Sequence, residues 1–193
     1  MLDKIRVVID PVIARIGRQA SKTGLPPDAW TLIGFLVAII ASLTYAKTIP
    51  GGPVLGGLLL LLAGFFDILD GAVAKATGKM TRSGAFLDST IDRLSEITIY
   101  LGILFGGYTD PWLVFIALSF SLLVSYSRAR AEPLGVNLRG IGIGERPERL
   151  IILGILSILS LVAEAVLIVA VLAILTFGQR FFVTMKGIEE TKS

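Results

Sequence analysis

Four aspartates stand in two closely spaced pairs near the middle of the chain, Asp67 with Asp70 and Asp88 with Asp92. Residues three or four apart share a face of a helix, so each pair should project together from its own helix. Four carboxylates in an apolar setting repel one another and stay ionised only if cations compensate them. Mg²⁺ and Mn²⁺ are the hard cations that oxygen ligands prefer, and two such ions can clamp a transferring phosphoryl group. The pattern therefore predicts a site for two divalent metal ions.

A short segment rich in Gly, Lys and Thr separates the two pairs, which predicts that they face each other across two neighbouring helices. Aspartates at helix ends are more often caps or surface charges, but four at these spacings between apolar segments are hard to explain that way. A divalent-metal transporter is the alternative of another class, because carboxylates inside a membrane can form an ion path. A transporter would have carboxylates spread through the depth of the membrane. In this chain the only carboxylates in the outer half of the membrane are Asp110 and Glu164, at the outer ends of the predicted spans.

The composition indicates an integral membrane protein. Of 193 residues 54% are hydrophobic and only 17% are charged, whereas soluble domains are about a quarter charged. Cysteine and histidine are both absent, which excludes disulfides, thiol nucleophiles and imidazole acid–base chemistry. A general base must then be a carboxylate, a lysine or a tyrosine. The net charge of +3 gives no reason to expect a nucleic-acid partner.

Helices that cross a membrane need roughly 20 mostly apolar residues. The two candidate spans nearest the C-terminus, 148–163 and 165–183, are separated only around residues 162–164, so a tight turn joins them. Five transmembrane helices is therefore the alternative to six. The predicted fold is a single all-α domain, 1–193, with a bundle of six transmembrane helices over 29–183 and a cytoplasmic tail, 184–193. The candidate spans are 29–47, 52–73, 85–107, 111–131, 148–163 and 165–183.

Residues 1–22 precede the first span and read as an amphipathic helix that lies in the cytoplasmic membrane interface. Pro26 and Pro27 then break the chain before the first span. The apolar residues at helical spacing are Ile5, Val8, Ile9, Val12, Ile13 and Ile16, and the charged residues on the other faces include Lys4, Arg15 and Arg18.

The basic residues predict the orientation. If the N-terminus is cytoplasmic, only Lys47 of the 18 lysines and arginines falls on the outer side. Cytoplasmic loops carry an excess of Lys and Arg, so both termini and the aspartates should lie on the cytoplasmic side of the cell membrane.

The pattern D-x₂-D-G-x₂-A-K-x₈-G-x₃-D-x₃-D from Asp67 to Asp92 resembles the signature of the CDP-alcohol phosphotransferases. The resemblance implies six transmembrane helices, commonly a homodimer, with an active site open to the cytoplasm. It implies that the four aspartates bind two metal ions and that Asp92 also deprotonates the acceptor hydroxyl. Lys75 stands where that family usually has Arg, and lysine lacks the bidentate fork for phosphate. The implied CDP-lipid-binding residues in this stretch are Asp67, Gly71, Ala74, Lys75 and Gly84.

Two further elements resemble parts of the same donor site. The segment from Pro27 to Thr31 resembles a P-D-x-x-T element that contacts the cytidine, which implies roles for Asp28 and Thr31. Taken alone, the segment is a helix start with Asp28 near the cap, and both interpretations can hold. Thr81 is a plausible hydroxyl for the phosphate side.

The segments 125–132 and 144–149 resemble those of phosphatidylinositol-phosphate and archaetidylinositol-phosphate synthases, whose acceptor is inositol phosphate. Arginine near a bilayer is costly unless it is paired, and its planar guanidinium suits phosphate. The alternative is that these arginines are topology signals that reach anionic lipid headgroups, with Glu145 and Glu148 neutralising some of them. The residues that the resemblance places on the acceptor phosphate are Arg128, Arg146 or Arg149, and Arg180.

The predicted reaction is the metal-dependent transfer of a phosphatidyl or archaetidyl group from CDP-diacylglycerol or CDP-archaeol to a hydroxyl of inositol phosphate, with release of CMP. Glycerol 3-phosphate, serine or free inositol as acceptor are the alternatives within the family. Membrane lipids and a second copy of the chain are the expected partners.

Overall fold

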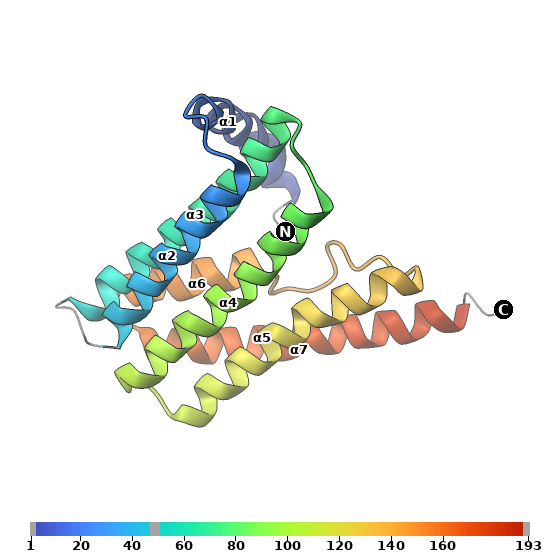
Figure 1. Ribbon diagram of the computed structural model, residues 1–193. Helices are drawn as coiled ribbons and strands as arrows, with labels where there is room; N and C mark the ends of the chain where they lie inside the picture. The colour runs from blue at the N-terminus through green and yellow to red at the C-terminus, as the bar shows by residue number, and fades with distance from the viewer. Residues whose placement is uncertain (1–2, 47–50, 191–193) are drawn as a thin grey trace.

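The computed structural model describes the backbone of residues 3–46 and 51–190, and every regular element in these ranges is helical (Figure 1). The prediction of an all-α fold is therefore confirmed. The helices are α1 (Asp3–Ser21), α2 (Pro27–Tyr45), α3 (Gly52–Thr77), α4 (Arg82–Gly106), α5 (Pro111–Ala131), α6 (Arg146–Ile158) and α7 (Val162–Glu190), with a 3₁₀ turn η1 (Glu132–Leu134) after α5.

Six of the helices form a ring in which each packs on two neighbours. Around the ring the order is α2, α3, α6, α7, α5 and α4, which returns to α2. Figure 1 shows α5 and α7 running side by side, and α1 lying across the end of α3 outside the ring. The consecutive helices α3 and α4 make little direct contact. The aspartate-bearing helices therefore face each other across the interior of the ring.

Residues at the helix ends explain where α3 stops and α4 starts. Gly78 ends α3 in the left-handed conformation, with φ 67°, which glycine adopts without strain. Thr81 then caps α4, and its hydroxyl accepts a hydrogen bond from the backbone N–H of Gly84 at 3.0 Å. Proline stands in the first turn of α2, α3, α5 and α6, where its missing N–H costs nothing.

Small residues let α6 approach α3 closely. A Cβ atom on Gly57 of α3 would lie 2.6 Å from the carbonyl oxygen of Gly154 of α6, so only glycine fits there. Helices in membranes commonly associate through such small residues, because lipid gives no hydrophobic drive for their packing. The contact fixes α6 against the helix that carries Asp67 and Asp70.

Four of the helices are long and apolar enough to cross a membrane: α2, α3, α5 extended to Leu134, and α7. Helix α4 carries charged side chains in its first half, and α6 has only 13 residues, about 20 Å against a hydrocarbon core of about 30 Å. The count of six spans therefore stays a prediction.

Several boundaries differ from those expected. The predicted fifth span, 148–163, is α6 over Arg146–Ile158, and the turn after it contains Ser160 with a positive φ of 62°. Helix α7 continues to Glu190, so 184–190 of the expected tail are helical. Lys47, the end of the first predicted span and residues 191–193 lie outside the described residues.

Residues 3–21 form helix α1, and both the amphipathic character expected for 1–22 and its place at a membrane surface stay predictions. Gly17 is the residue that packs on α3, where its Cβ would lie 2.7 Å from that of Ala72. The side chains of Val12 and Ile16 are exposed. The side chains of residues 1–9, which include Lys4, Ile5, Val8 and Ile9, are outside the described part of the structure.

The packing of α3 on α6 gives the first testable prediction. Gly57→Ala should lower the thermal unfolding temperature of the protein in detergent, because the added methyl group must push α6 away. Overpacking of this kind costs about 1–3 kcal/mol. Gly64→Ala on the same helix is the matched control, since its Cβ would make only an ordinary contact at 3.9 Å. Equal stability of the two variants would contradict the packing described.

Candidate metal and substrate site

Three of the four predicted metal ligands come together between α3 and α4. Asp67 of α3 and Asp88 and Asp92 of α4 each offer a carboxylate oxygen, and these oxygens lie within 4.8 Å of one another. An all-oxygen, anionic donor set of this size suits a hard divalent cation. The residues present therefore fit Mg²⁺ or Mn²⁺, and we call these three together with Asp70 the carboxylate cluster.

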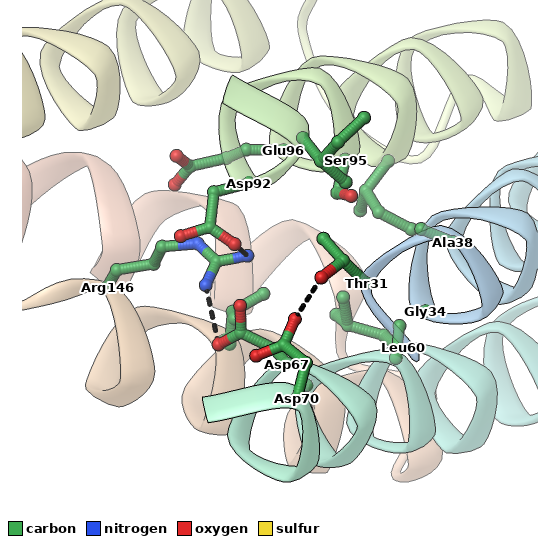
Figure 2. A pocket seen from close by; sticks show the side chains of 15 residues that line it. Thr31, Gly34, Ala38, Leu60, Asp67, Asp70, Asp92, Ser95, Glu96 and Arg146 are labelled. Atoms are coloured by element: carbon green, nitrogen blue, oxygen red, sulfur yellow. Dashed lines mark hydrogen bonds and ion pairs between the residues drawn. The ribbon is translucent and has the colours of Figure 1, made fainter. Parts of the chain in front are cut away.

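Asp70 is held by a side chain from a third helix. Its side chain is buried, 5% exposed, and its Oδ2 accepts a hydrogen bond from the Thr31 hydroxyl of α2 at 2.5 Å (Figure 2). The Thr31 hydroxyl oxygen also lies 3.4 Å from the carbonyl oxygen of Pro27 on its own helix. A bond of this kind fixes the orientation of a ligating carboxylate. Thr31 thus has a geometric role that the sequence motif alone did not specify.

Arg146, the first residue of α6, reaches into the cluster. Its Nη1 donates to Asp67 Oδ2 at 2.9 Å, and its Nη2 lies 2.8 Å from Asp92 Oδ1 (Figure 2). The guanidinium therefore joins one carboxylate from each aspartate pair. The sequence analysis placed Arg146 on the acceptor phosphate, whereas the structure places it on two predicted metal ligands.

Arg149, one turn after Arg146, is buried and paired. It is 2% exposed, and its Nη2 donates to Glu96 of α4 at 2.9 Å while its Nη1 donates to the carbonyl of Gly144 at 2.9 Å. It lines neither of the two cavities that reach the carboxylate cluster. This differs from the expected acceptor contact, because Glu96 supplies a counter-charge within the bundle.

Arg180 of α7 is also buried, at 3% exposure, and fully engaged. It donates to the carbonyls of Ile141 and Val124 at 2.9 and 2.8 Å and to Glu145 at 3.0 Å. Arg128 is more exposed and pairs with Glu132 at 2.9 Å, one turn further along the chain. The structure thus places Arg146 on the carboxylate cluster, whereas Arg128, Arg149 and Arg180 each pair with a glutamate.

Glu96 is the charged residue that the sequence analysis missed. It lies four residues after Asp92, so both carboxylates project from the same side of α4 (Figure 2). Its position inside the predicted span 85–107 was the available signal, since a charge in a membrane segment needs a partner.

A cavity of about 210 Å³ opens between the start of α2, the end of α3 and the start of α4. Asp70 and Asp88 form its boundary with the carboxylate cluster, and Lys79 and Met80 line it from the connecting segment. Of the predicted CDP-lipid-binding residues, only Asp67 does not line it. The others do: Asp28, Thr31, Gly71, Ala74, Lys75, Thr81 and Gly84.

Local geometry supports a ligand in this cavity. A Cβ atom on Gly71 would meet nothing within 4 Å, so the backbone there is open to close approach. Asp28 lies in the first turn of α2, next to the N-cap region as expected for a helix start, and the N-cap Pro26 has no side-chain capping bond. Thr81 has a capping role, through Gly84, and lines the cavity as well.

A second, smaller cavity lies deeper, between α2, α3, α4 and α6. Its volume of about 30 Å³ gives room for about two water molecules. Asp67, Asp92, Glu96 and Arg146 line it beside apolar residues that include Leu60 (Figure 2). Thr31 and Asp70 line both cavities, so the two cavities adjoin at the carboxylate cluster.

The bond between Thr31 and Asp70 yields a prediction about metal affinity. Thr31→Val keeps the shape of the side chain but removes the hydroxyl, so the Asp70 carboxylate loses its fixed orientation. Mn²⁺ binding, measured by calorimetry in detergent, should weaken about tenfold, whereas Thr31→Ser should stay near the parent value. Thr98→Val is the matched control, because the Thr98 hydroxyl donates to the carbonyl of Leu94 on its own helix. An unchanged affinity in Thr31→Val would show that Asp70 does not depend on Thr31.

Comparisons with known proteins agree with this site. Residues 24–179 match the family model of CDP-alcohol phosphatidyltransferase. An archaetidylinositol phosphate synthase of Pyrococcus horikoshii is 43% identical over 189 residues, 98% of this chain and 99% of that protein. A phosphatidylinositol phosphate synthase of Mycobacteroides abscessus is 39% identical over 68% of this chain and 61% of its own length.

Solved structures of phosphatidylinositol phosphate synthase from Mycobacterium tuberculosis have the same fold. The structure with CDP-DAG bound has a TM-score of 0.77 and 30% identity, over 90% of this chain and 94% of that one. The structure in complex with manganese and citrate has a TM-score of 0.78 and 31% identity, over 90% and 88%. The sequence matches cover most of the chain, and they show that it belongs to the CDP-alcohol phosphatidyltransferase family.

Proposed function

We propose that this protein transfers a lipid-linked phosphoryl group from a CDP-lipid to a hydroxyl of inositol phosphate and releases CMP. The observation that carries the proposal is the position of the carboxylate cluster, which borders the outer cavity where the predicted donor residues gather. The relatives named as inositol phosphate synthases, one of them similar over nearly the whole chain, support the choice of acceptor.

The reaction breaks the phosphoanhydride bond of the CDP-lipid and forms a phosphoester bond to the acceptor. The acceptor oxygen bonds to the phosphorus that carries the lipid, and CMP leaves with the bridging oxygen of the pyrophosphate. Asp92 is proposed as the base that takes the hydroxyl proton, since it lines the inner cavity and does not line the outer one, where the donor is proposed to lie. When bound, two divalent ions held by Asp67, Asp70, Asp88 and Asp92 would stabilise the charge on the transferring group.

The donor is proposed to lie in the outer cavity. Its phosphates would approach the open backbone at Gly71 and the N-terminal turn of α4, where unpaired N–H groups favour anions. Lys75 and Lys79 line the same cavity and supply positive charge. The cytidine would lie toward Asp28 at the start of α2.

The acceptor phosphate is proposed to bind on the opposite side, where α5, α6 and α7 bring the arginines. Of the four predicted arginines, Arg146 is the one that contacts the cluster, and Arg128 is the most accessible of the other three. Arg149 and Arg180 are buried and bound to carbonyls, so in this arrangement they hold the segment before α6 in place.

The membrane arrangement that we propose keeps all six ring helices as spans. Their ring includes α4 and α6, and the charges of these two helices are turned toward partners inside the ring. Lysine and arginine then lie on the cytoplasmic side with the cluster and both termini. α1 lies at that membrane surface, and the active form is a homodimer.

The assay that tests the proposed function follows CMP release by purified protein. CDP-diacylglycerol and CDP-archaeol are each offered with inositol phosphate, inositol, glycerol 3-phosphate or serine. Inositol phosphate should be the best acceptor, activity should require Mg²⁺ or Mn²⁺, and Asp88→Asn should lower it by at least about a hundredfold. Equal use of free inositol would refute the acceptor, and CMP release that resists chelation would refute the metal site.

Lys75 gives a prediction for the donor side alone. Lys75→Ala should raise the KM for the CDP-lipid about tenfold, because a hydrogen bond to a charged phosphate is lost. Lys75→Arg should keep or lower that KM, since guanidinium binds phosphate with two donors. Lys22→Ala, an exposed lysine away from the cavity, is the control. A donor KM that stays the same in Lys75→Ala would show that this side chain only faces solvent.

A further inference from the structure

Two ion pairs connect α4 with α6 at successive turns. Asp92 and Glu96 are four residues apart on α4, and Arg146 and Arg149 are three apart on α6, so the pairs are stacked along the two helices. The two helices are not neighbours in the ring: α4 packs on α2 and α5, whereas α6 packs on α3 and α7. These pairs therefore tie together two helices across the interior of the bundle.

The two pairs differ in burial. The side chains of Glu96 and Arg149 are 5% and 2% exposed, whereas those of Asp92 and Arg146 are 15% and 16% exposed. A buried ion pair adds little stability on balance, because both charges lose their hydration. Its retention in the bundle is better explained by the geometry that it imposes.

That geometry concerns the segment that leads into α6. Besides Glu96, Arg149 binds the carbonyl of Gly144 at 2.9 Å and that of Ser121 on α5 at 3.4 Å. The N–H of Gly144 donates to the Thr176 hydroxyl of α7 at 2.9 Å. Arg149 thus fixes a chain segment that ends two residues before Arg146, and it is itself fixed by Glu96.

We infer that Glu96 is a positioning residue for the transfer reaction, which acts through Arg149 to set Arg146 over the carboxylate cluster. The inference rests on the proposed function. Glu96 and Arg149 line no part of the outer cavity, so they act on the acceptor side and on ion binding, not on the CDP-lipid.

The main test replaces the buried pair by an apolar one, Glu96→Met with Arg149→Met. Apolar residues of similar volume often restore the stability of a buried ion pair, so this double variant should fold, whereas Glu96→Gln strands a buried charge. In the double variant the KM for inositol phosphate should rise about tenfold, because Arg146 loses its fixed approach, while the KM for the CDP-lipid stays within about twofold. Ser157→Ala, a buried polar residue about two turns along α6, is the control and should change neither value.

A second measurement does not depend on activity. Arg146 pairs with two carboxylates of the cluster, so Mn²⁺ competes with it, and Arg146→Gln should tighten Mn²⁺ binding about tenfold. The double methionine change should also tighten binding in the parent protein but have no effect once Arg146→Gln is present, since it acts through that residue. If the double variant does not fold, Glu96→Asp takes its place. Glu96→Asp should then tighten Mn²⁺ binding in the parent protein and have no effect on it once Arg146→Gln is present.

The outcomes separate the two proposals. The positioning role is overturned if the double variant folds and its KM for inositol phosphate is unchanged. It is also overturned if the double methionine change alters Mn²⁺ affinity equally with and without Arg146→Gln. If inositol phosphate proves not to be an acceptor, the proposed function fails, and the Mn²⁺ measurement alone still decides the role of Glu96.

Discussion

Negative charge concentrated in a poorly solvated place is the constraint on which this structure depends. Asp67, Asp88 and Asp92 have oxygens within 4.8 Å of one another, and Asp70 lies beside them. Two like charges 4 Å apart repel by about 4 kcal/mol at an effective dielectric constant of 20. The chain itself supplies two positive charges to the cluster, that of Arg146 and that of Arg93, whose Nη1 lies 3.4 Å from Asp92 Oδ2. The remaining negative charge makes the cluster a strong site for cations. Glu96 does not add to this charge, because Arg149 pairs with it.

The ring of helices creates the space for this charge. If α3 and α4 packed closely, as consecutive helices often do, their aspartates would have no room for ions or phosphate. Instead α2 packs against both of them and holds Asp70 through Thr31, while α6 packs on α3 through Gly57 and Gly154. The close glycine contact brings the first turn of α6 to the level of Asp67. Small residues in the apolar part of the bundle thus place a charged residue in its polar part.

The sequence predicted those parts of the site that depend on local spacing. The aspartate pairs share helix faces, and the segment between Thr77 and Arg82 is too short to separate α3 from α4 widely, so the donor residues had to gather near them. Partner choice between distant segments was not predictable in this way. Arg146 and Asp67 are 79 residues apart, and Arg149 and Glu96 are 53 apart, so no local rule selects them. The same charges explain why α4 is not among the four candidate spans, because it turns carboxylates into the bundle and an average over the sequence counts them as polar, whereas α6 is too short.

The two cavities divide the carboxylate cluster between the proposed substrates. Asp70 and Asp88 border the outer cavity, where the CDP-lipid is proposed to bind, and Asp67 and Asp92 border the inner one together with Arg146. Asp88 and Asp92 of α4 thus border one cavity each, whereas Asp70 of α3 borders both cavities and Asp67 only the inner one. An in-line displacement at phosphorus requires the attacking oxygen and the leaving oxygen on opposite sides of the transferring group. Lys75 and Gly71 lie on the leaving-group side, and Asp92 and Arg146 lie on the other side. The acceptor hydroxyl would therefore meet its base opposite the departing CMP. This arrangement is possible because α3 and α4 face each other across a gap that neither helix fills.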